Sequence, residues 1–543
     1  MRSHPVHILS VLVFCTFIAG IAKAAYVGTK YDPKEKHGLE KIVPASSDTN
    51  HNIYGKIYTI DGESMVDYVH YQSLEDYTVT DDDGTPHVYT RREKIAKRER
   101  TDDTTDLYIP TDPAYASIIG IRDQCGLLKN AKGVLTADGL PINKERSEGD
   151  YIITTIHSKA QKEAIHQLEE YRKYYNQYVN ENFAYKDANG NVNYITEHTT
   201  ASIAVVSSDG AILVAAGTNT FETMDYINEL DQYSLDSGCL PHELDPQSLI
   251  TVNLPLDHTD FVGSSFKPVT ARVLEQNNDS LDPEYSIYND SFVDVDSFTY
   301  DGKTYGNWDG AHGDRLLSLS LAFKYSSNLY FMRHAINLGL DKYCKELCRL
   351  FLLDKELETD IGSVQPLPFN EVRPETITYG QGAKLSPVHL ASLYNALLFS
   401  GDLYTPFMTC EVRDPELGLI YHQNSNDNKK HLFDVERDEN GSNIIVEGLK
   451  DTFLSYIENN TIDSVPDDIL RSGRFIAKSG TADKVDDHVI NRTMCVSILN
   501  KEQTDVICTG VIAINTINAD AAPSNYSLVK ALIDTMTKLE GVI

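Results

Sequence analysis

The chain has 543 residues, of which 41% are hydrophobic and 24% are charged. This length and composition support a large buried core divided over two or three domains, and they argue against a disordered chain. The formal net charge of −32 argues against electrostatic binding to nucleic acid or to anionic lipid.

Near the N-terminus, an apolar run at residues 8–22 follows a short leader that contains Arg2. The run is at the long end for a cleavable signal peptide and slightly short for a membrane-spanning helix. Residues 22–24 read Ala-Lys-Ala, an acceptable cleavage site. Residues 1–25 are therefore predicted to be a signal-anchor or a signal peptide, and either one places the body of the chain outside the cytoplasmic membrane.

Residues 26–148 are predicted to form a smaller N-terminal module that is rich in Tyr and Asp. Short strand-like runs lie at 107–109 and 116–121, whereas residues 93–97 favour a helix. The acidic residues show no EF-hand spacing, so the sequence predicts no metal site. A helix over residues 159–168 is expected to link this module to the next one.

Three short motifs follow in a fixed order. Residues 264–267 read Ser-Ser-Phe-Lys, residues 326–328 read Ser-Ser-Asn, and residues 478–481 read Lys-Ser-Gly-Thr. They spell S-x-x-K, S-x-N and K-[ST]-G, which together are typical of serine enzymes that acylate on penicillin or on D-Ala-D-Ala peptides. A chain this long contains about two S-x-x-K matches by chance, and residues 527–530 form one. Only the first match opens a complete, ordered set.

The first motif supplies a serine nucleophile and its base. A serine hydroxyl needs a base to remove its proton, and Lys267 follows Ser264 by one helical turn, on the same face. Residues 268–274 favour that helix, with Pro268 in the first turn, where proline is tolerated. Lys267 can accept a proton only in its neutral form, which burial and a second cation such as Lys478 favour.

The other two motifs supply a proton relay, a positioning group and a binding strand. Ser326, after an apolar run at 316–323 that favours a helix, can relay a proton, and Asn328 can hold Lys267 or a substrate carbonyl. Residues 474–482 favour a strand that enters the site. It carries Lys478 and the expected substrate-binding residues Ser479, Gly480 and Thr481. The backbone N–H groups of Ser264 and Thr481 form a possible oxyanion hole.

Each motif also has a plainer interpretation when taken alone. Ser264 could be an ordinary helix N-cap, residues 326–328 a turn between helices, and residues 474–482 a solvated edge strand protected by its lysine. The ordered combination of all three favours the catalytic interpretation.

These motifs and longer matches around them resemble the class B penicillin-binding proteins, which are membrane-anchored transpeptidases of peptidoglycan synthesis. Residues 263–268 are similar to the G-S-T-F-K-P segment of that family, and residues 307–331 resemble the stretch around its S-x-N motif. Residues 379–391 resemble its G-Q-G and T-P-x-x-L-A segments, and residues 201–215 its first strand pair. Val262 departs from the proline that the family usually has there.

The resemblance implies an α/β fold of the penicillin-binding transpeptidase and serine β-lactamase type over residues 149–543. We expect a mostly antiparallel sheet that includes residues 201–215 and 474–513, with helices on both faces. A helical lobe carries Ser264 and residues 316–350. The N-terminal module corresponds to a pedestal or dimerisation module.

The resemblance further implies a peptidoglycan D,D-transpeptidase that β-lactams inhibit covalently. Ser264 attacks the carbonyl between two terminal D-Ala residues, Lys267 is the base, Ser326 and Lys478 are the proton relay, and Asn328 is the positioning group. Lys478 and Thr481 bind the substrate carboxylate. No metal or cofactor is expected.

The expected partner is a membrane glycosyltransferase of the SEDS family, and the expected location is the cell membrane, with a single span and an extracellular body. Secretion after signal cleavage is the alternative. The family's roles are in cell shape and cell division. Two other functions stay open: a D,D-carboxypeptidase or β-lactamase with the same site, in which water resolves the acyl-enzyme, and a non-catalytic β-lactam sensor or scaffold.

The cysteines are expected to be free thiols. Eight are present, one of them in the apolar N-terminal run, and an odd number cannot all pair within one chain. Cys495 and Cys508 flank an expected hairpin around residues 501–502 and would face each other unless the strand register separates them.

Overall fold

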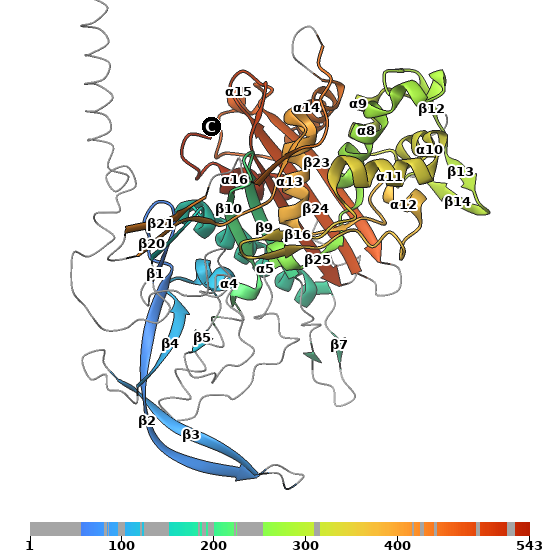
Figure 1. Ribbon diagram of the computed structural model, residues 1–543. Coiled ribbons are helices and arrows are strands. Elements are labelled where there is room, and N and C mark those ends of the chain that lie inside the picture. Colours follow the sequence, from blue (N-terminus) through green and yellow to red (C-terminus); the bar gives the residue numbers. More distant parts are fainter. Residues whose placement is uncertain are drawn as a thin grey trace, which may run out of the picture.

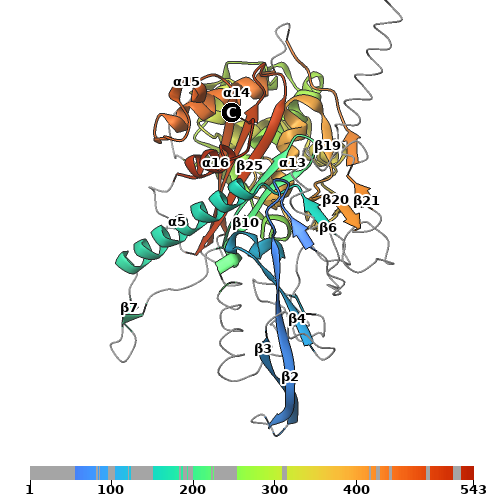
Figure 2. The same cartoon turned by 90° about the vertical axis from the view of Figure 1, so that its left-hand side faces the viewer.

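The fold combines a helix-covered body with a long ribbon of strands that extends away from it, as Figure 1 and Figure 2 show from two sides. The computed structural model describes residues 56–80, 84, 86–95, 104–119, 122–123, 151–182, 185–186, 192–193, 200–221, 224, 254–308, 315–414, 418–423, 428–438, 443–484, 489–517 and 527–542. The expected signal or anchor segment, residues 1–25, lies outside the described residues. No helix in the described ranges is long and apolar enough to cross a membrane.

The body is built on a five-stranded sheet in which every neighbouring pair is antiparallel. In spatial order its strands are β10 (Ile212–Gly217), β9 (Thr200–Ser207), β25 (Val506–Ile517), β24 (Val489–Leu499) and β23 (Phe475–Lys484). The predicted antiparallel sheet is confirmed. Strand β23 lies at its edge, so one side of that strand stays unpaired with the sheet.

Helices cover both faces of this sheet, as predicted. Because side chains alternate along a strand, Ile476 and Ala477 of β23 belong to two different hydrophobic clusters. On the face of Ala477 lie α5 (Ser158–Asn182) and α16 (Leu528–Met536). On the face of Ile476 lie α8 (Lys267–Gln276) and α13 (Pro387–Asn395), with the short helix α7 (Leu254–Asp257) beside them.

A helical lobe packs beside α8. Its helices are α9 (Leu319–Lys324), α10 (Asn328–Leu338), α11 (Leu340–Phe351) and α12 (Pro374–Ile377). The apolar run at 316–323 is only partly helical, because β15 (Arg315–Leu317) pairs with β12 (Phe292–Asp294). The helix starts at Leu319, since the Ser318 hydroxyl accepts a hydrogen bond from the Leu321 N–H and caps α9.

Short pairs of antiparallel strands and two helices complete the body. They are β11 (Asp260–Phe261) with β18 (Lys384–Leu385), β13 (Ser297–Tyr300) with β14 (Lys303–Gly306), β16 (Leu357–Thr359) with β17 (Gly362–Val364), β19 (Asp402–Tyr404) with β22 (Lys429–His431), β7 (Tyr185–Lys186) with β8 (Val192–Asn193), α14 (Ile444–Ile457) and α15 (Asp467–Leu470).

The N-terminal ribbon is a second sheet, with the order β3-β2-β4-β5. Its strands are β2 (Val66–Thr80), β3 (Pro86–Ile95), β4 (Thr104–Pro110) and β5 (Arg122–Asp123). The strand expected at 107–109 lies in β4 and is confirmed. The helix expected at 93–97 is wrong over its described part, because residues 93–95 pair with β2 in a long ladder that outweighs their helix propensity. Residues 96–97 lie outside the described residues.

The strand-like run at 116–121 is also wrong over its described part. Residues Ala116–Ile119 form the helix α4 and are all buried. The Asp112 side chain accepts a hydrogen bond from the Ala114 N–H, and Pro113 follows in the first turn, so a capped 3-10 turn leads directly into the helix. This capping outweighs the preference of two isoleucines for a strand.

A small third sheet joins the two parts of the chain. Strand β1 (Lys56–Tyr58) runs parallel to β6 (Tyr151–Thr154), which pairs in turn with β20 (Thr409–Asp414); β21 (Gly418–His422) lies at the edge. The domain boundary at residue 148 stays a prediction, and these strands pair across it.

The cysteines in the described residues, Cys344, Cys348, Cys410, Cys495 and Cys508, are free. Cys508 lies opposite Ile498, and Cys495 lies opposite Val511, so the strand register separates the two cysteines that flank the hairpin. They belong to hydrophobic clusters on opposite faces of the sheet. The expectation of free thiols is confirmed for these five.

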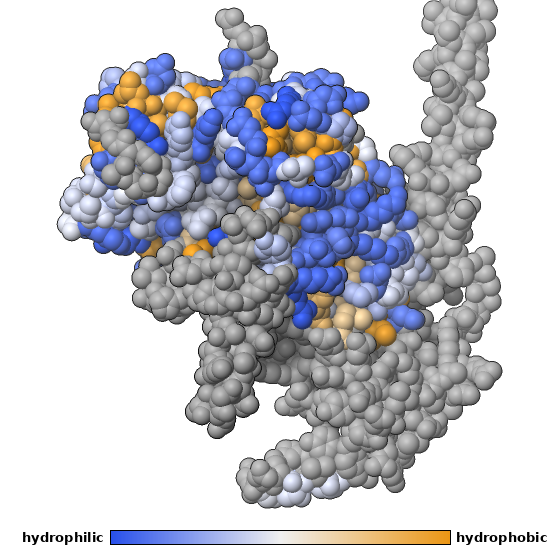
Figure 3. All heavy atoms as spheres, turned by 180° about the vertical axis from the view of Figure 1, so that it is seen from behind, coloured by the Kyte–Doolittle hydropathy of each residue, from blue (hydrophilic) through white to orange (hydrophobic). Residues whose placement is uncertain are grey.

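The rear surface of the described body carries separate hydrophobic areas between hydrophilic ones, so it does not form one continuous apolar face (Figure 3). This pattern fits a chain with 80 acidic and 48 basic residues.

Candidate active site

The first motif lies at the start of helix α8. Residues Gly263–Phe266 form a 3-10 turn that continues into the helix at Lys267, and Pro268 occupies the first turn, where its missing N–H leaves no bond unmade. The expected helix over 268–274 is confirmed. The turn is fixed from behind, because the Tyr394 hydroxyl donates to the Ser265 carbonyl at 2.6 Å. Ser264 therefore lies partly exposed in a turn whose backbone is held by a hydrogen bond.

Lys267 joins the first two motifs. Its side chain is fully buried, and its Nζ lies 2.8 Å from Ser264 Oγ. The same nitrogen lies 2.9 Å from Asn328 Oδ1, 3.1 Å from Ser326 Oγ and 2.5 Å from the Ser326 carbonyl oxygen. A buried amino group needs such partners, because an unsatisfied one costs about 2–7 kcal/mol. The structure thus brings together four of the residues that the sequence singled out.

Lys478 joins the third motif to the other two. It lies on β23, is 1% exposed, and its Nζ is 3.1 Å from Ser326 Oγ. The Ser326 hydroxyl consequently lies between the amino groups of Lys267 and Lys478. A hydroxyl can both donate and accept, so this arrangement can pass a proton from one amino group to the other.

Ser326 has an unusual backbone conformation. Its φ of 54° is in the left-handed region, which costs a residue other than glycine about 1–3 kcal/mol. Helix α9 ends just before it, and Ser327 caps helix α10 just after it by accepting a hydrogen bond from the Tyr330 N–H at 3.0 Å. The two helices therefore force a sharp turn that aims the Ser326 side chain at both lysines.

Close backbone contacts hold the three motifs together. A Cβ on Gly480 would lie 2.0 Å from the Val262 carbonyl oxygen, and one on Gly380 would lie 1.7 Å from that of Gly263. The Gly263 N–H donates to the Gly380 carbonyl oxygen at 3.1 Å. The sequence explained Gly480 by the approach of a substrate backbone. The structure adds a second reason, since the chain itself occupies the space of a side chain there.

The residues after Lys478 point in different directions. The side chain of Ser479 lies on the face of β23 opposite to the side chain of Lys478, where the Ser479 hydroxyl is 2.8 Å from the Tyr456 hydroxyl. The Ser479 N–H also donates to Tyr456 Oη, at 3.0 Å, so it points away from β24. Because N–H directions repeat every second residue, the N–H of the exposed Thr481 points to that same unpaired side. Thr481 can therefore offer both a hydroxyl and an N–H to a ligand.

Cys495 lies behind the site without competing as a nucleophile. It is opposite Lys478 in the sheet and fully buried. Burial raises the pKa of its thiol to about 12, and a neutral thiol is a poor nucleophile.

The second S-x-x-K match has an ordinary structural role. Ser527 caps helix α16 by accepting a hydrogen bond from the Lys530 N–H, and the Lys530 side chain pairs with Asp534. The ordered motif set thus distinguished Ser264, which lies beside Lys267, from Ser527, which caps a helix. No group of three or more His, Cys, Asp or Glu residues in the described ranges could hold a metal ion.

Sequence reasoning missed two groups that hold the site. Tyr456 comes from helix α14, 23 residues away from Ser479, and no spacing rule connects them. Asn307 was noted only as part of a resembling stretch, yet its side chain accepts the Asn328 N–H at 2.7 Å. Its position directly before the only tryptophan of the chain was the one available signal.

Comparisons with known proteins find relatives by sequence and by fold. A family model described as the penicillin binding protein transpeptidase domain matches residues 201–534. Stage V sporulation protein D of Bacillus subtilis (strain 168) is 26% identical over 243 residues, which make up 43% of this chain and 34% of that protein. Penicillin-binding protein 3 of the same organism is 26% identical over 201 residues, 33% of this chain and 28% of that protein. The chain spans about a third of the length of these curated relatives.

Solved structures show the same fold. The D,D-transpeptidase domain of a peptidoglycan glycosyltransferase from Eggerthella lenta has a TM-score of 0.57 at 16% identity, covering 90% of this chain and 99% of that one. Penicillin-binding protein A from M. tuberculosis, solved as an imipenem acyl-enzyme complex, has a TM-score of 0.56 at 15% identity and covers 89% and 98%. The predicted fold class is confirmed.

The close contact at Gly380 yields a testable prediction. Gly380→Ala should lower the rate at which a penicillin acylates the chain by about a hundredfold, because a displacement of about 1 Å at a site can cost that much. Gly339→Ala is the matched control, since φ is +92° there and +88° at Gly380, but a Cβ at 339 meets nothing within 4 Å. Equal acylation rates in the two variants would show that the contact does not position the site.

Proposed function

Because the chain belongs to the penicillin-binding protein transpeptidase family, we propose that it is a class B peptidoglycan D,D-transpeptidase whose acyl-enzyme forms on Ser264. The resemblance drawn from the sequence to this family is confirmed. The observation that carries the assignment of the nucleophile is the position of the buried Lys267 Nζ, which lies 2.8 Å from Ser264 Oγ and contacts both Ser326 and Asn328.

The first half-reaction forms the acyl-enzyme. Ser264 Oγ attacks the carbonyl carbon between the two terminal D-Ala residues of a peptide stem, and neutral Lys267 takes the hydroxyl proton. The peptide bond then breaks, and the departing D-Ala nitrogen receives a proton by way of Ser326, which lies between Lys267 and Lys478. An ester on Ser264 and a free D-Ala result.

Substrate binding falls to the edge of the sheet. A terminal carboxylate calls for a cation and hydroxyl donors, and Lys478 and Thr481 supply them on β23. The unpaired side of this strand can also accept an extended peptide through backbone hydrogen bonds. In this proposal the N–H groups of Ser264 and Thr481 bind the oxyanion. Ser479 supports the binding strand indirectly, because its hydroxyl and its N–H both contact Tyr456 and its carbonyl oxygen accepts from Lys478 Nζ.

The second half-reaction is transfer to an amine of a neighbouring stem. The amine attacks the ester carbonyl and loses a proton, and Ser264 leaves with its hydroxyl restored. In the described part of the chain, neither Ser264 nor Ser326 hydrogen-bonds to a carboxylate that could activate water. This supports a transpeptidase over a β-lactamase in which a carboxylate activates water.

We further propose that residues 1–25 anchor the chain in the cell membrane, with its body outside, and that a SEDS-family glycosyltransferase is its partner in cell shape or cell division. The apolar run at 8–22 supports the anchor. The same substrate class makes β-lactams expected ligands, as an imipenem acyl-enzyme is known for the M. tuberculosis protein of similar fold.

Acylation should be specific to Ser264. A fluorescent penicillin should label the wild-type chain and Ser527→Ala equally, and it should not label Ser264→Ala, because Ser527 is a helix cap. Peptide mapping by mass spectrometry locates the adduct. An adduct at Ser527, or none at saturating penicillin, would contradict the assignment.

Removing the proposed base should slow acylation. Lys267→Ala should lose at least about a hundredfold in rate, the usual scale for a general base, and Lys267→Arg should fare no better because arginine stays protonated. Lys530→Ala, in the second S-x-x-K match, is the control and should acylate normally. Stopped-flow labelling measures the rates, and a fast Lys267→Arg variant would exclude Lys267 as the base.

The products separate a transpeptidase from its alternatives. With polymerised lipid-linked precursor, the chain should form more cross-linked dimers than trimmed stems, since a bound amine reacts ahead of water when both reactants are held in place. The penicilloyl adduct should persist for many minutes. Rapid turnover of the adduct would indicate a β-lactamase, trimmed stems alone a carboxypeptidase, and a stable adduct without either product a sensor or scaffold.

A further inference from the structure

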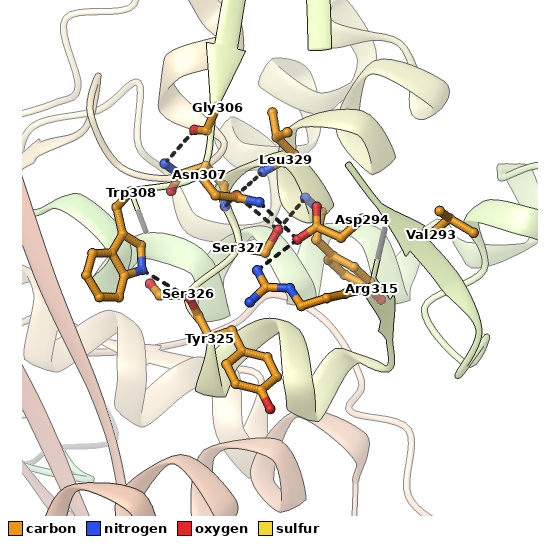
Figure 4. A network of polar contacts seen from close by, with 12 residues as sticks. Val293, Asp294, Gly306, Asn307, Trp308, Arg315, Tyr325, Ser326, Ser327 and Leu329 are labelled. Atoms are coloured by element: carbon orange, nitrogen blue, oxygen red, sulfur yellow. Dashed lines mark hydrogen bonds and ion pairs between the residues drawn. The ribbon is translucent and has the colours of Figure 1, made fainter. Parts of the chain in front are cut away.

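The side-chain amide of Asn307 binds the start of helix α10, which carries Asn328. Its Oδ1 accepts three hydrogen bonds, from the Asn328 N–H at 2.7 Å, from the Leu329 N–H at 3.2 Å and from the Ser327 hydroxyl at 3.3 Å. Figure 4 shows this amide between the helix start on one side and Asp294 on the other. Asn307 therefore contacts the whole second half of the S-x-N loop.

The other end of the same amide is tied to a buried carboxylate. Asn307 Nδ2 donates to Asp294 Oδ2 at 2.9 Å, and Arg315 Nη2 lies 3.3 Å from that oxygen. Asp294 is 1% exposed and belongs to β12, whose partner strand β15 carries Arg315. An ionised carboxylate can only accept hydrogen bonds. It therefore holds the Asn307 NH2 group on its own side and turns Oδ1 toward helix α10.

The residue after Asn307 holds the other flank of the loop. Trp308 Nε1 donates to the Tyr325 carbonyl oxygen at 3.1 Å, directly before Ser326 (Figure 4). Residues 307 and 308 thus bracket Ser326, whose φ is 54°. From the inside, Lys267 Nζ contacts the Ser326 carbonyl oxygen. The positions of Ser326 and Asn328 relative to Lys267 consequently depend on Asn307.

We propose that Asn307, oriented by Asp294, is a positioning residue for acylation: it keeps Ser326 and Asn328 in contact with Lys267. The inference deepens the proposed function and rests on it. Among the described contacts, Ser264 Oγ is bound by Lys267 and not by Asn307. Asn307 therefore does not touch the reacting atom itself. Its effect therefore appears in the rate of the acylation step and not in the binding of the β-lactam.

Exchanging the chemistry of the pair tests this role. Asn307→Asp keeps the size and the acceptor toward α10, but it sets a carboxylate against the buried Asp294. Asp294→Asn is milder, because the new amide still offers an oxygen to Asn307 and Arg315. In the double variant Asn307→Asp/Asp294→Asn, the amide nitrogen at position 294 can take the place of Asp294 Oδ2 and donate to the carboxylate at position 307, at the cost of the longer contact with Arg315. The double variant should recover what the first one loses.

The experiment measures saturating acylation by a fluorescent penicillin on the full chain, with the rate constant and the labelled fraction recorded separately. Asn307→Asp should lower the maximal rate by about a hundredfold while the half-saturating penicillin concentration and the labelled fraction stay unchanged. Asp294→Asn should lose less than about tenfold, and the double variant should return to within about tenfold of the wild type. A variant that merely misfolds would lose labelled fraction instead of rate.

A matched control lies at the far end of the same helix. Asn337 Nδ2 donates to Asp282 Oδ2 at 2.7 Å in an exposed pair of the same chemistry. Asn337→Asp should acylate within about twofold of the wild type, because water screens the pair. An unlabelled wild-type chain would contradict the proposed function and this inference with it. Wild-type rates in Asn307→Asp, a loss confined to labelled fraction, or a folded double variant as slow as Asn307→Asp would each overturn this inference alone.

Discussion

The site depends on the burial of one lysine. Lys267 is fully buried, and a buried amino group must be given polar partners or the fold loses several kcal/mol. Its partners come from two places in the chain, the turn that bears Ser264 and the loop of Ser326 and Asn328. The requirement to satisfy Lys267 therefore brings together the side chains that we propose as nucleophile, base and relay hydroxyl, namely Ser264, Lys267 and Ser326.

Glycines make this assembly geometrically possible. Gly263, Gly380 and Gly480 lie where the backbones of three segments approach too closely for any side chain, with hypothetical Cβ contacts between 1.7 and 2.5 Å. This packing places the edge strand β23 against the Ser264 turn. Lys478 Nζ thereby reaches the same Ser326 hydroxyl that Lys267 Nζ contacts, and Thr481 lies exposed on the strand. The motif glycines are thus structural conditions for the two lysines to share one hydroxyl.

The sequence predicted those parts of the structure that depend on local spacing. The helical turn from Ser264 to Lys267, the proline in its first turn and the strand of Lys478 follow from periodicity and capping, and the order of three motifs singled out Ser264 over Ser527. Groups that act across the fold could not be predicted in this way. The bond from Tyr456 to Ser479 depends on tertiary packing, and so does the pair of Asn307 with Asp294. Local propensity also misled at residues 93–95, where a long ladder imposed a strand.

The central claim is that Ser264, Lys267 and Ser326 act as one chemical unit beside an oxyanion site on β23. A crystal structure of the chain after reaction with a penicillin tests it most directly. The account predicts an ester on Ser264 Oγ, with its carbonyl oxygen accepting hydrogen bonds from the N–H groups of Ser264 and Thr481 and with Lys267 Nζ still in contact with Ser326. An ester carbonyl turned away from Thr481, or a Lys267 displaced from Ser326, would contradict the account.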